Sequence, residues 1–168
     1  IRSAELIGMS FSFEAGKAYY VPLPEERDAA QPWLAAFQPF FESESVRKIG
    51  QNLKYDIGVL LNYDVEVRGP LFDTMIAHYL LQPDMRHKMD ILAETYLNYT
   101  TITYESVVGK KGKMQKTLRE VTLEAVTDYA AEDADITLQL KEVFAPKLKE
   151  TGVEKVFENI EMPLVPVL

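Results

Sequence analysis

Residues 48–56, which read KIGQNLKYD, carry the clearest information on the fold. Residues 46–50 have the character of a short strand, and apolar residues then recur on one helix face over residues 53–63. If Asn52 caps that helix, it lies near the carboxyl end of the strand, where open α/β sheets commonly bind ligands. This strand–helix unit predicts an α/β fold with a binding site at its turn.

Segments on both sides of this unit extend the pattern. Residues 5–13 and 17–23 predict a strand hairpin, because Gly16 between them can adopt the positive φ of a tight turn. A helix over residues 28–43 follows, with a break or kink at Pro39. The other predicted elements are a strand over 65–72, helices over 74–82, 90–99 and 122–150, a polar loop over 105–115, and a last helix from 153. This order predicts a mixed sheet with helices on its faces.

Composition narrows the classes of function. The chain has 168 residues, 47% hydrophobic and 26% charged, as in an ordinary globular domain. It has no cysteine and two histidines, which excludes disulfides, thiolate metal sites and a three-histidine metal site. The net charge of −8 disfavours a protein that binds nucleic acid by phosphate neutralisation alone. A metal held mainly by carboxylate oxygens fits this balance better.

Residues 128–135, which read DYAAEDAD, place four carboxylates in eight residues. On a helix Tyr129 and Asp133 lie on one face, where a phenol and a carboxylate could together hold a water and Mg²⁺. A solvated acidic face beside a core tyrosine is the alternative. Asp56 lies one turn into the helix over 53–63, on the side of Asn52, and its alternative role is to complement the helix dipole.

Together these stretches resemble a known family. The spacings Asn52-x-x-x-Asp56 and Tyr129-x-x-x-Asp133 are similar to the second and third motifs of the DEDD 3′–5′ exonucleases, in the tyrosine form of the third motif. The amino-acid sequence over residues 48–56, 71–75, 129–135 and 158–164 resembles that of the proofreading domains of bacterial family A DNA polymerases. The resemblance implies a ribonuclease-H-like mixed sheet flanked by helices, and two-metal hydrolysis of the 3′-terminal phosphodiester that releases nucleoside monophosphates.

The resemblance also implies roles for single residues. Asp133 would bind the metal that activates water, Tyr129 would orient that water, and Asp56 would hold the second metal. The cations would be Mg²⁺ or Mn²⁺. The implied partners are the single-stranded 3′ end of DNA and a polymerase domain in the same chain, in the bacterial cytoplasm and without a membrane. The residues implied to contact the DNA end are Gln51, Asn52, Tyr55, Arg86 and, against a base, Tyr104.

The chain departs from the family pattern at its first motif. An Asp-x-Glu pair on the first, central strand is expected a little upstream of Ala4 and is not found there. We interpret the chain as a piece of a larger polypeptide, with an exonuclease domain over 1–152 and the start of a helix into the polymerase domain over 153–168. Either that polypeptide retains the motif or its branch has lost it. We expect the isolated piece to be inactive, to bind cations weakly, and to have a perturbed sheet or to form a homo-oligomer through open sheet edges.

Two other functions remain open from the sequence. One is a non-catalytic module that supports the polymerase and holds single-stranded ends; the other is an exoribonuclease of the same superfamily, which the text at 158–168 disfavours. Residues outside the motifs are given structural roles. We interpret His78 and His87 as structural, Asp73 as a helix cap and Trp33 as core, and the lysines of the 105–115 loop and Lys116 as solvated.

Overall fold

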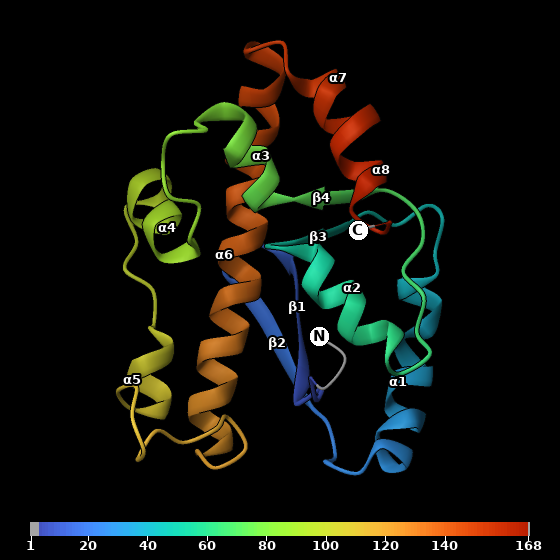
Figure 1. Cartoon of the computed structure of the whole chain (residues 1–168), viewed down its shortest axis with the longest axis vertical. Coiled ribbons are helices and arrows are strands. Elements are labelled where there is room, and N and C mark those ends of the chain that lie inside the picture. Colours follow the sequence, from blue (N-terminus) through green and yellow to red (C-terminus); the bar gives the residue numbers. More distant parts are fainter. Residues whose placement is uncertain (1–3, 168) are drawn as a thin grey trace.

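The computed structural model describes residues 4–167 of the chain. Residues 1–3, in the predicted exonuclease domain over 1–152, and residue 168, in the predicted helix over 153–168, lie outside the described residues. Two strand pairs and a set of helices surround one long helix (Figure 1). The elements are β1 (Gly8–Glu14), β2 (Lys17–Pro22), α1 (Arg27–Phe41), β3 (Lys48–Gly50), α2 (Leu53–Leu61), β4 (Leu71–Asp73), α3 (Thr74–Leu81), α4 (Met89–Leu97), α5 (Tyr104–Val108), α6 (Leu123–Glu150), α7 (Glu154–Val156), η1 (Phe157–Glu161) and α8 (Met162–Leu164).

The predicted hairpin is confirmed. β1 and β2 pair antiparallel, from Gly8 opposite Pro22 to Glu14 opposite Lys17. Gly16 lies in the connecting turn with φ 79°, a conformation that costs glycine little because it has no Cβ.

The described strands form two separate pairs, which agrees with the perturbed mixed sheet that the sequence predicts. β3 and β4 pair parallel, with Gly50 opposite Asp73, and β1 pairs with β2. The α/β class and the mixed strand orientations therefore agree with the prediction. Association through the unpaired edges stays a prediction.

The strand expected over residues 65–72 is wrong for most of its length, because only Leu71–Asp73 forms β4. The preceding residues make a turn: the Arg68 N–H donates to the Phe41 carbonyl, and Gly69 has φ 80°. The buried Lys48 ammonium also donates to the Arg68 carbonyl. These bonds direct the backbone groups of the segment to neighbours other than a strand.

Helix α6 connects the parts of the molecule. It contacts β1, β2 and β3 as well as α3, α4 and α5, and Figure 1 shows it running along the molecule between α4 and α5 on one side and α1 and α2 on the other. Its C-terminal half supplies much of the larger core cluster. The buried α6 residues of this cluster are Ile136, Leu140, Phe144 and Leu148. The predicted helix over 122–150 is confirmed almost residue for residue, and it continues through Pro146.

A second core cluster joins β1 to α1 and α2, with Met9, Leu34 and Leu60 among its buried residues. The break expected at Pro39 does not occur, since α1 continues to Phe41. Proline removes only one N–H donor, and at this position the loss falls in the last turn, next to the buried Phe41 ring. Trp33 was expected in the core, but it is 50% exposed because it lies beside, not on, the inward stripe of α1.

Two further segments differ from expectation. The first residues of the predicted loop over 105–115 belong to α5, whose start is capped by the Thr103 hydroxyl accepting from the Ser106 N–H. The helix expected from 153 begins after Gly152, which has φ 76°, and consists of α7, η1 and α8 in succession. Along the part of the chain that the structure describes, none of the helices is both long enough and apolar enough to span a bilayer.

Candidate active site

The N-terminal half of α6 brings together a phenol and a carboxylate. Tyr129 and Asp133 lie one turn apart, with the Tyr129 hydroxyl beside the Asp133 carboxylate. Burial raises the pKa of Asp133 to about 6 even though the neighbouring Tyr129 hydroxyl acts in the opposite direction. Burial, followed by the charge of Asp133, also raises the pKa of the Tyr129 hydroxyl. The pair therefore holds an incompletely compensated carboxylate beside a hydroxyl that stays protonated.

The neighbouring acids of α6 have different partners. Glu132 accepts hydrogen bonds from the Tyr99 hydroxyl at 2.7 Å and from the Ile102 N–H at 2.6 Å. Asp135 accepts from the Gly16 N–H at 2.7 Å and from the Gln139 amide at 2.8 Å. Glu132 thus ties the α4–α5 connection to α6, and Asp135 ties the hairpin turn to it. A uniformly solvated acidic face does not describe this stretch.

The start of α2 is built differently from the sequence interpretation. Asn52 occupies the N-cap position with φ 68°, a left-handed conformation in which asparagine is enriched, and its side chain makes no capping bond. The cap is supplied by Asp73, which accepts from the Asn52 and Leu53 N–H groups at 3.2 and 2.7 Å. The exposed Asn52 side chain is therefore directed by the turn and is not used to close the helix.

Asp73 also caps α3, as the sequence predicts. Its carboxylate accepts from the N–H groups of Met75 and Ile76, so one buried side chain holds the first turns of two helices. Desolvation by the surrounding protein raises the pKa of Asp56 to about 7, and the negative charge of Asp73 adds to the effect. Asp56 still presents an open edge to solvent. A cation reaching it would meet a carboxylate without a basic partner.

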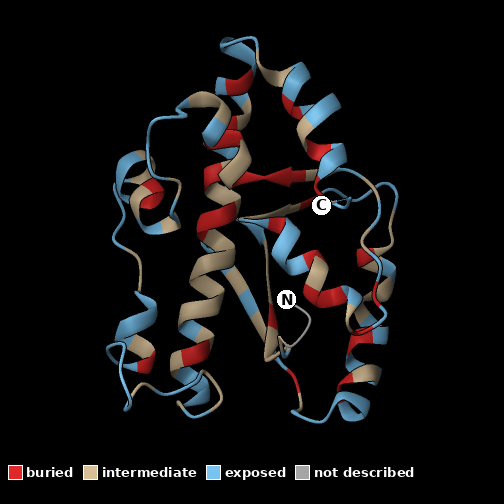
Figure 2. Cartoon of the chain, in the orientation of Figure 1, coloured by how far each residue is buried: buried red, intermediate tan, exposed pale blue. Residues whose placement is uncertain are grey.

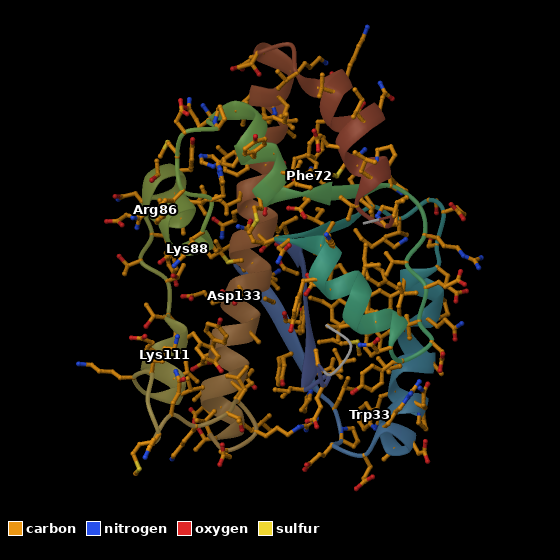
Figure 3. The ribbon with its side chains drawn as sticks, in the orientation of Figure 1. Trp33, Phe72, Arg86, Lys88, Lys111 and Asp133 are labelled. Carbon is orange, nitrogen blue, oxygen red and sulfur yellow. The ribbon has the colours of Figure 1, made fainter. Side chains whose placement is uncertain are left out.

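The elements that carry Asp56 and Asp133 meet at β3. Helix α6 contacts β3, and α2 begins at Leu53, directly beyond the end of that strand. Figures 1 and 3 show α2 starting beside the middle of α6, the part of the helix where Asp133 is labelled. The arrangement is compatible with a shared site, and the catalytic and metal-binding roles of these residues stay predictions.

Gln51 and Arg86 are linked through one loop. The Gln51 amide donates to the His87 carbonyl at 2.8 Å, while its carbonyl accepts from the Thr74 hydroxyl. Gln51 therefore fastens residues 82–88, the loop that presents the exposed Arg86. These bonds occupy the Gln51 amide, so any contribution it makes to substrate binding acts through the position of this loop.

Tyr55 and Tyr104 are both available to a ligand, with 47% and 45% of their surfaces exposed. Tyr55 lies in the first turn of α2, after the Asn52 turn. Tyr104 packs edge-on against the Tyr129 ring, with the ring centroids 6.2 Å apart. The structure thus brings Tyr104 to the Tyr129–Asp133 pair, which was not evident from their separation in the sequence.

The histidines have structural partners, as expected. His78 is fully buried, its Nδ1 lies 2.7 Å from Nδ1 of His87, and its Nε2 lies 3.1 Å from the Tyr96 hydroxyl. Burial and the neighbouring His87 lower the pKa of His78. The cluster ties α3, the Arg86 loop and α4 together. This tie does not follow from the sequence, because it joins residues of separate elements.

Neither an Asp-x-Glu site nor a ready cation cage occurs within residues 4–167. The Asp-x-Glu sequence Asp64-Val65-Glu66 is present, but Asp64 pairs with Arg27 and Glu66 with Arg68, and both acids are exposed. No group of three or more His, Cys, Asp or Glu side chains is positioned to hold a metal among the described residues. A cavity of about 340 Å³ lies instead between β4 and the C-terminal helices, lined by residues such as Phe72 and Phe157.

Sequence comparison identifies relatives along the whole chain. Residues 1–149 match the 3′–5′ exonuclease family. DNA polymerase I of Pseudomonas aeruginosa is 42% identical over 180 residues, which cover 99% of this chain and 19% of the relative. DNA polymerase I of Borreliella burgdorferi is 38% identical, again over 99% of this chain and over 18% of the relative. The chain thus spans about a fifth of the length of these relatives.

Solved structures share the fold. A nuclease in its apo form has a TM-score of 0.77 at 18% identity, covering 97% of this chain and 73% of the nuclease. Brucella melitensis NrnC has a TM-score of 0.71 at 24% identity, covering 90% of this chain and 69% of NrnC. These likenesses support the predicted ribonuclease-H-like α/β fold. With the family match over most of its length, the chain belongs to the 3′–5′ exonuclease family.

Proposed function

We propose that this chain is the 3′–5′ exonuclease domain of a bacterial DNA polymerase I and contributes to hydrolysis of the terminal phosphodiester at a single-stranded 3′ end. The observation that carries the proposal is the Tyr129 hydroxyl beside the Asp133 carboxylate on α6. The relatives named DNA polymerase I support the identity of the parent protein. Their polymerase region would be the partner of this domain, in the bacterial cytoplasm.

The donor chemistry fits Mg²⁺ or Mn²⁺. Asp56 and Asp133 offer carboxylate oxygens, the ligands that hard divalent cations prefer, and the protein raises the pKa of both groups. None of the ion pairs among the described residues neutralises either carboxylate. Two divalent cations in such a site would supply positive charge to the attacking and leaving oxygens of the phosphodiester. Two side chains provide only part of a coordination shell, so the isolated chain should bind cations weakly and hydrolyse DNA slowly or not at all.

The chain's own residues would position the water and the DNA end. Tyr129, which stays protonated, would hold the attacking water, and the neighbouring Asp133 carboxylate would orient the Tyr129 hydroxyl. Asn52 and Tyr55 would contact the terminal nucleotide from the first turn of α2. The exposed Tyr104 ring would pack on a base, a contact that tolerates any sequence.

Basic side chains flank the site locally despite the acidic total charge. Figure 3 labels Arg86, Lys88 and Lys111 on the side of α4 and α5, beyond α6 from the strands. Arg86 lies in the loop fastened by Gln51, and Lys111 lies in the loop after α5. Phosphates of a single strand approaching the Tyr129–Asp133 pair from this side would meet positive charge. The net charge of −8 does not oppose binding along such a local path.

Hydrolysis of a 5′-labelled single-stranded oligonucleotide tests the proposal. The chain, expressed with any coding sequence that adjoins it, is incubated with Mn²⁺ beside the variants Asp133→Ala and Asp128→Ala. We expect stepwise shortening from the 3′ end and nucleoside monophosphate products, lost in Asp133→Ala and kept in Asp128→Ala. Equal degradation by both variants contradicts the assignment of Asp133. Binding of the strand without any hydrolysis, with or without the adjoining sequence, would favour the non-catalytic alternative.

A further inference from the structure

We infer that Glu132 is a positioning residue, which holds Tyr104 against Tyr129 so that the Tyr104 ring can receive the terminal base. The inference rests on the proposed function, in which Tyr104 contacts the DNA end. It concerns the neighbour of Asp133 in the sequence, a residue whose carboxylate binds the connection between α4 and α5.

Both oxygens of the Glu132 carboxylate are engaged. One accepts from the Tyr99 hydroxyl at 2.7 Å and the other from the Ile102 N–H at 2.6 Å. Tyr99 follows Asn98, which ends α4 in a left-handed conformation, and Ile102 precedes the Thr103 cap of α5. Glu132 therefore hydrogen-bonds to both ends of the connection between α4 and α5. Charge-assisted bonds of this kind are stronger than bonds between neutral groups.

The bonds from Glu132 also determine where Tyr104 lies. Thr103 caps α5 through its bond from the Ser106 N–H, so fixing Ile102 also fixes where this helix begins. The Tyr104 ring then lies edge-on to Tyr129, with the centroids 6.2 Å apart. Tyr129 and Glu132 are three residues apart on α6 and lie on neighbouring faces. The contacts thus form a closed circuit from α6 through the connection and back to α6.

Helix α5 needs such a support. It contains five residues, Tyr104–Val108, and a helix this short does not persist by its own hydrogen bonds. At its far end Val108 is buried and accepts from the Lys116 N–H at 2.9 Å. At its near end Tyr104 is exposed, so the Glu132 bonds are what set the position of the ring. Without these bonds the Tyr104 ring could still pack on a base, but it would no longer be held against Tyr129.

Steady-state hydrolysis of a single-stranded oligonucleotide, by the chain expressed with any coding sequence that adjoins it, separates positioning from chemistry. The variants are Glu132→Ala, Tyr99→Phe, which removes one of the two bonds, and Glu142→Ala as a matched control. Glu142 is an exposed acid on the same helix that pairs only with the adjacent Lys141. In Glu132→Ala we expect KM to rise roughly tenfold with kcat within about twofold, a smaller rise in Tyr99→Phe, and no change in the control. A fall in kcat at unchanged KM overturns the inference.

A double-mutant cycle tests whether Glu132 acts through Tyr104. If it does, Glu132→Ala adds little to KM once Tyr104→Ala is present, because the ring it positions is gone. Rescue in Glu132→Gln should be partial, since the amide oxygen can accept from the Ile102 N–H and the amide N–H can donate to the Tyr99 hydroxyl, but the charge that strengthens both bonds is lost. Additive effects of Glu132→Ala and Tyr104→Ala overturn the inference.

Hydrogen exchange of the isolated chain distinguishes failure of the inference from failure of the proposed function. We expect faster amide exchange over residues 98–108 in Glu132→Ala and unchanged exchange in Glu142→Ala. If the wild-type protein hydrolyses no DNA while exchange responds as expected, the proposed function fails and the contact from Glu132 to α5 is supported. Unchanged exchange in Glu132→Ala overturns the inference at any level of activity.

Discussion

The two halves of α6 perform different tasks with the same backbone. From Ile136 onward the helix contributes five buried side chains, four of them apolar at a spacing of four residues. Before Ile136 only Val126 is buried, and the inward positions carry Tyr129, Glu132 and Asp133. Figure 2 shows the same contrast, with buried residues concentrated in the C-terminal half of α6. The C-terminal half holds the fold together, and the N-terminal half holds the candidate site.

The difference teaches how a site can be both exposed and fixed. The C-terminal half is held by burial of apolar surface, which is strong and has no directional requirement. The N-terminal half is held by hydrogen bonds from its acids to other elements, which are individually weaker and directional. Substitutions should therefore affect stability most in the C-terminal half of α6 and activity most in the N-terminal half.

The largest effect should come from Asp133→Ala. Loss of a carboxylate that holds a catalytic cation removes several kcal/mol of transition-state stabilisation, so we expect activity to fall about 10³-fold or more. The unfolding free energy should not fall by a comparable amount, since Asp133 is only partly buried. With the chain expressed together with any coding sequence that adjoins it, rates of 3′-end shortening and urea unfolding of the same preparations measure the two quantities. If Asp133→Ala instead lowers the free energy of unfolding by several kcal/mol, the proposed difference between the two halves of α6 is wrong.

Phe144→Ala tests the other half of the helix. Phe144 is fully buried and packs against His78 and Tyr96, so the substitution should lower the unfolding free energy by about 3–5 kcal/mol. That is a large part of the stability of an ordinary domain, about 5–15 kcal/mol. Urea unfolding followed by circular dichroism gives the value. Lys147→Ala, an exposed position on the same helix, is the control, and a loss below about 1 kcal/mol in Phe144→Ala would contradict this division.

The two halves also differ in what the sequence could predict. The buried positions Ile136, Leu140 and Phe144 recur with the helical period, so both the helix and its core face follow from periodicity. Tyr129 and Asp133 could be paired by the same geometry because both lie within one helix, one turn apart. Local rules were sufficient where the partner lies four residues away.

Contacts between distant segments could not be predicted in this way. The partners of Glu132 and the Gly16 partner of Asp135 lie 30 to 119 residues away, and no periodicity relates them. Asp73 was predicted to cap α3, but its second cap on α2 depends on the parallel register of β3 and β4. The strand expected over 65–72 was wrong because an apolar segment without a neighbouring strand turns its backbone groups elsewhere. The sequence carries these contacts only through the tertiary structure.

A smaller effect links the site to stability through pH. Because burial raises the pKa of Asp133 from 3.8 to about 6, its protonated carboxyl favours the fold below about pH 4, and this contribution is lost as the pH rises through 6. Asp133→Asn does not ionise, so its advantage over wild type should be near zero at pH 4 and reach a plateau above pH 7. Since Asp133 is partly open to solvent, we expect about 1 kcal/mol.

Thermal unfolding from pH 4 to pH 8, without divalent cations, measures this difference. A gain of about 1 kcal/mol corresponds to a rise in Tm of about 2–4 °C for a domain of this size. Asp128 is an exposed acid in the same sequence motif, and Asp128→Asn should show no such pH-dependent gain. If Asp133→Asn is less stable than wild type at pH 8, the carboxylate contributes to holding the fold, and the proposed division of α6 is wrong.

The smallest effect should come from Asp135→Ala, which removes the bond from α6 to the hairpin turn at Gly16. One hydrogen bond to a charged group at an exposed position is worth about 0.5–1.5 kcal/mol, and β1 and β2 keep their other contacts with α6. Hydrogen exchange should quicken in the turn and remain unchanged over residues 98–108, and hydrolysis should be unaffected. Because Asp135 and Glu132 lie on the same helix three residues apart, this result would show that the acids of the motif act separately. A loss of activity in Asp135→Ala would instead mean that the hairpin turn shapes the site, so that the N-terminal half of α6 functions as one coupled network.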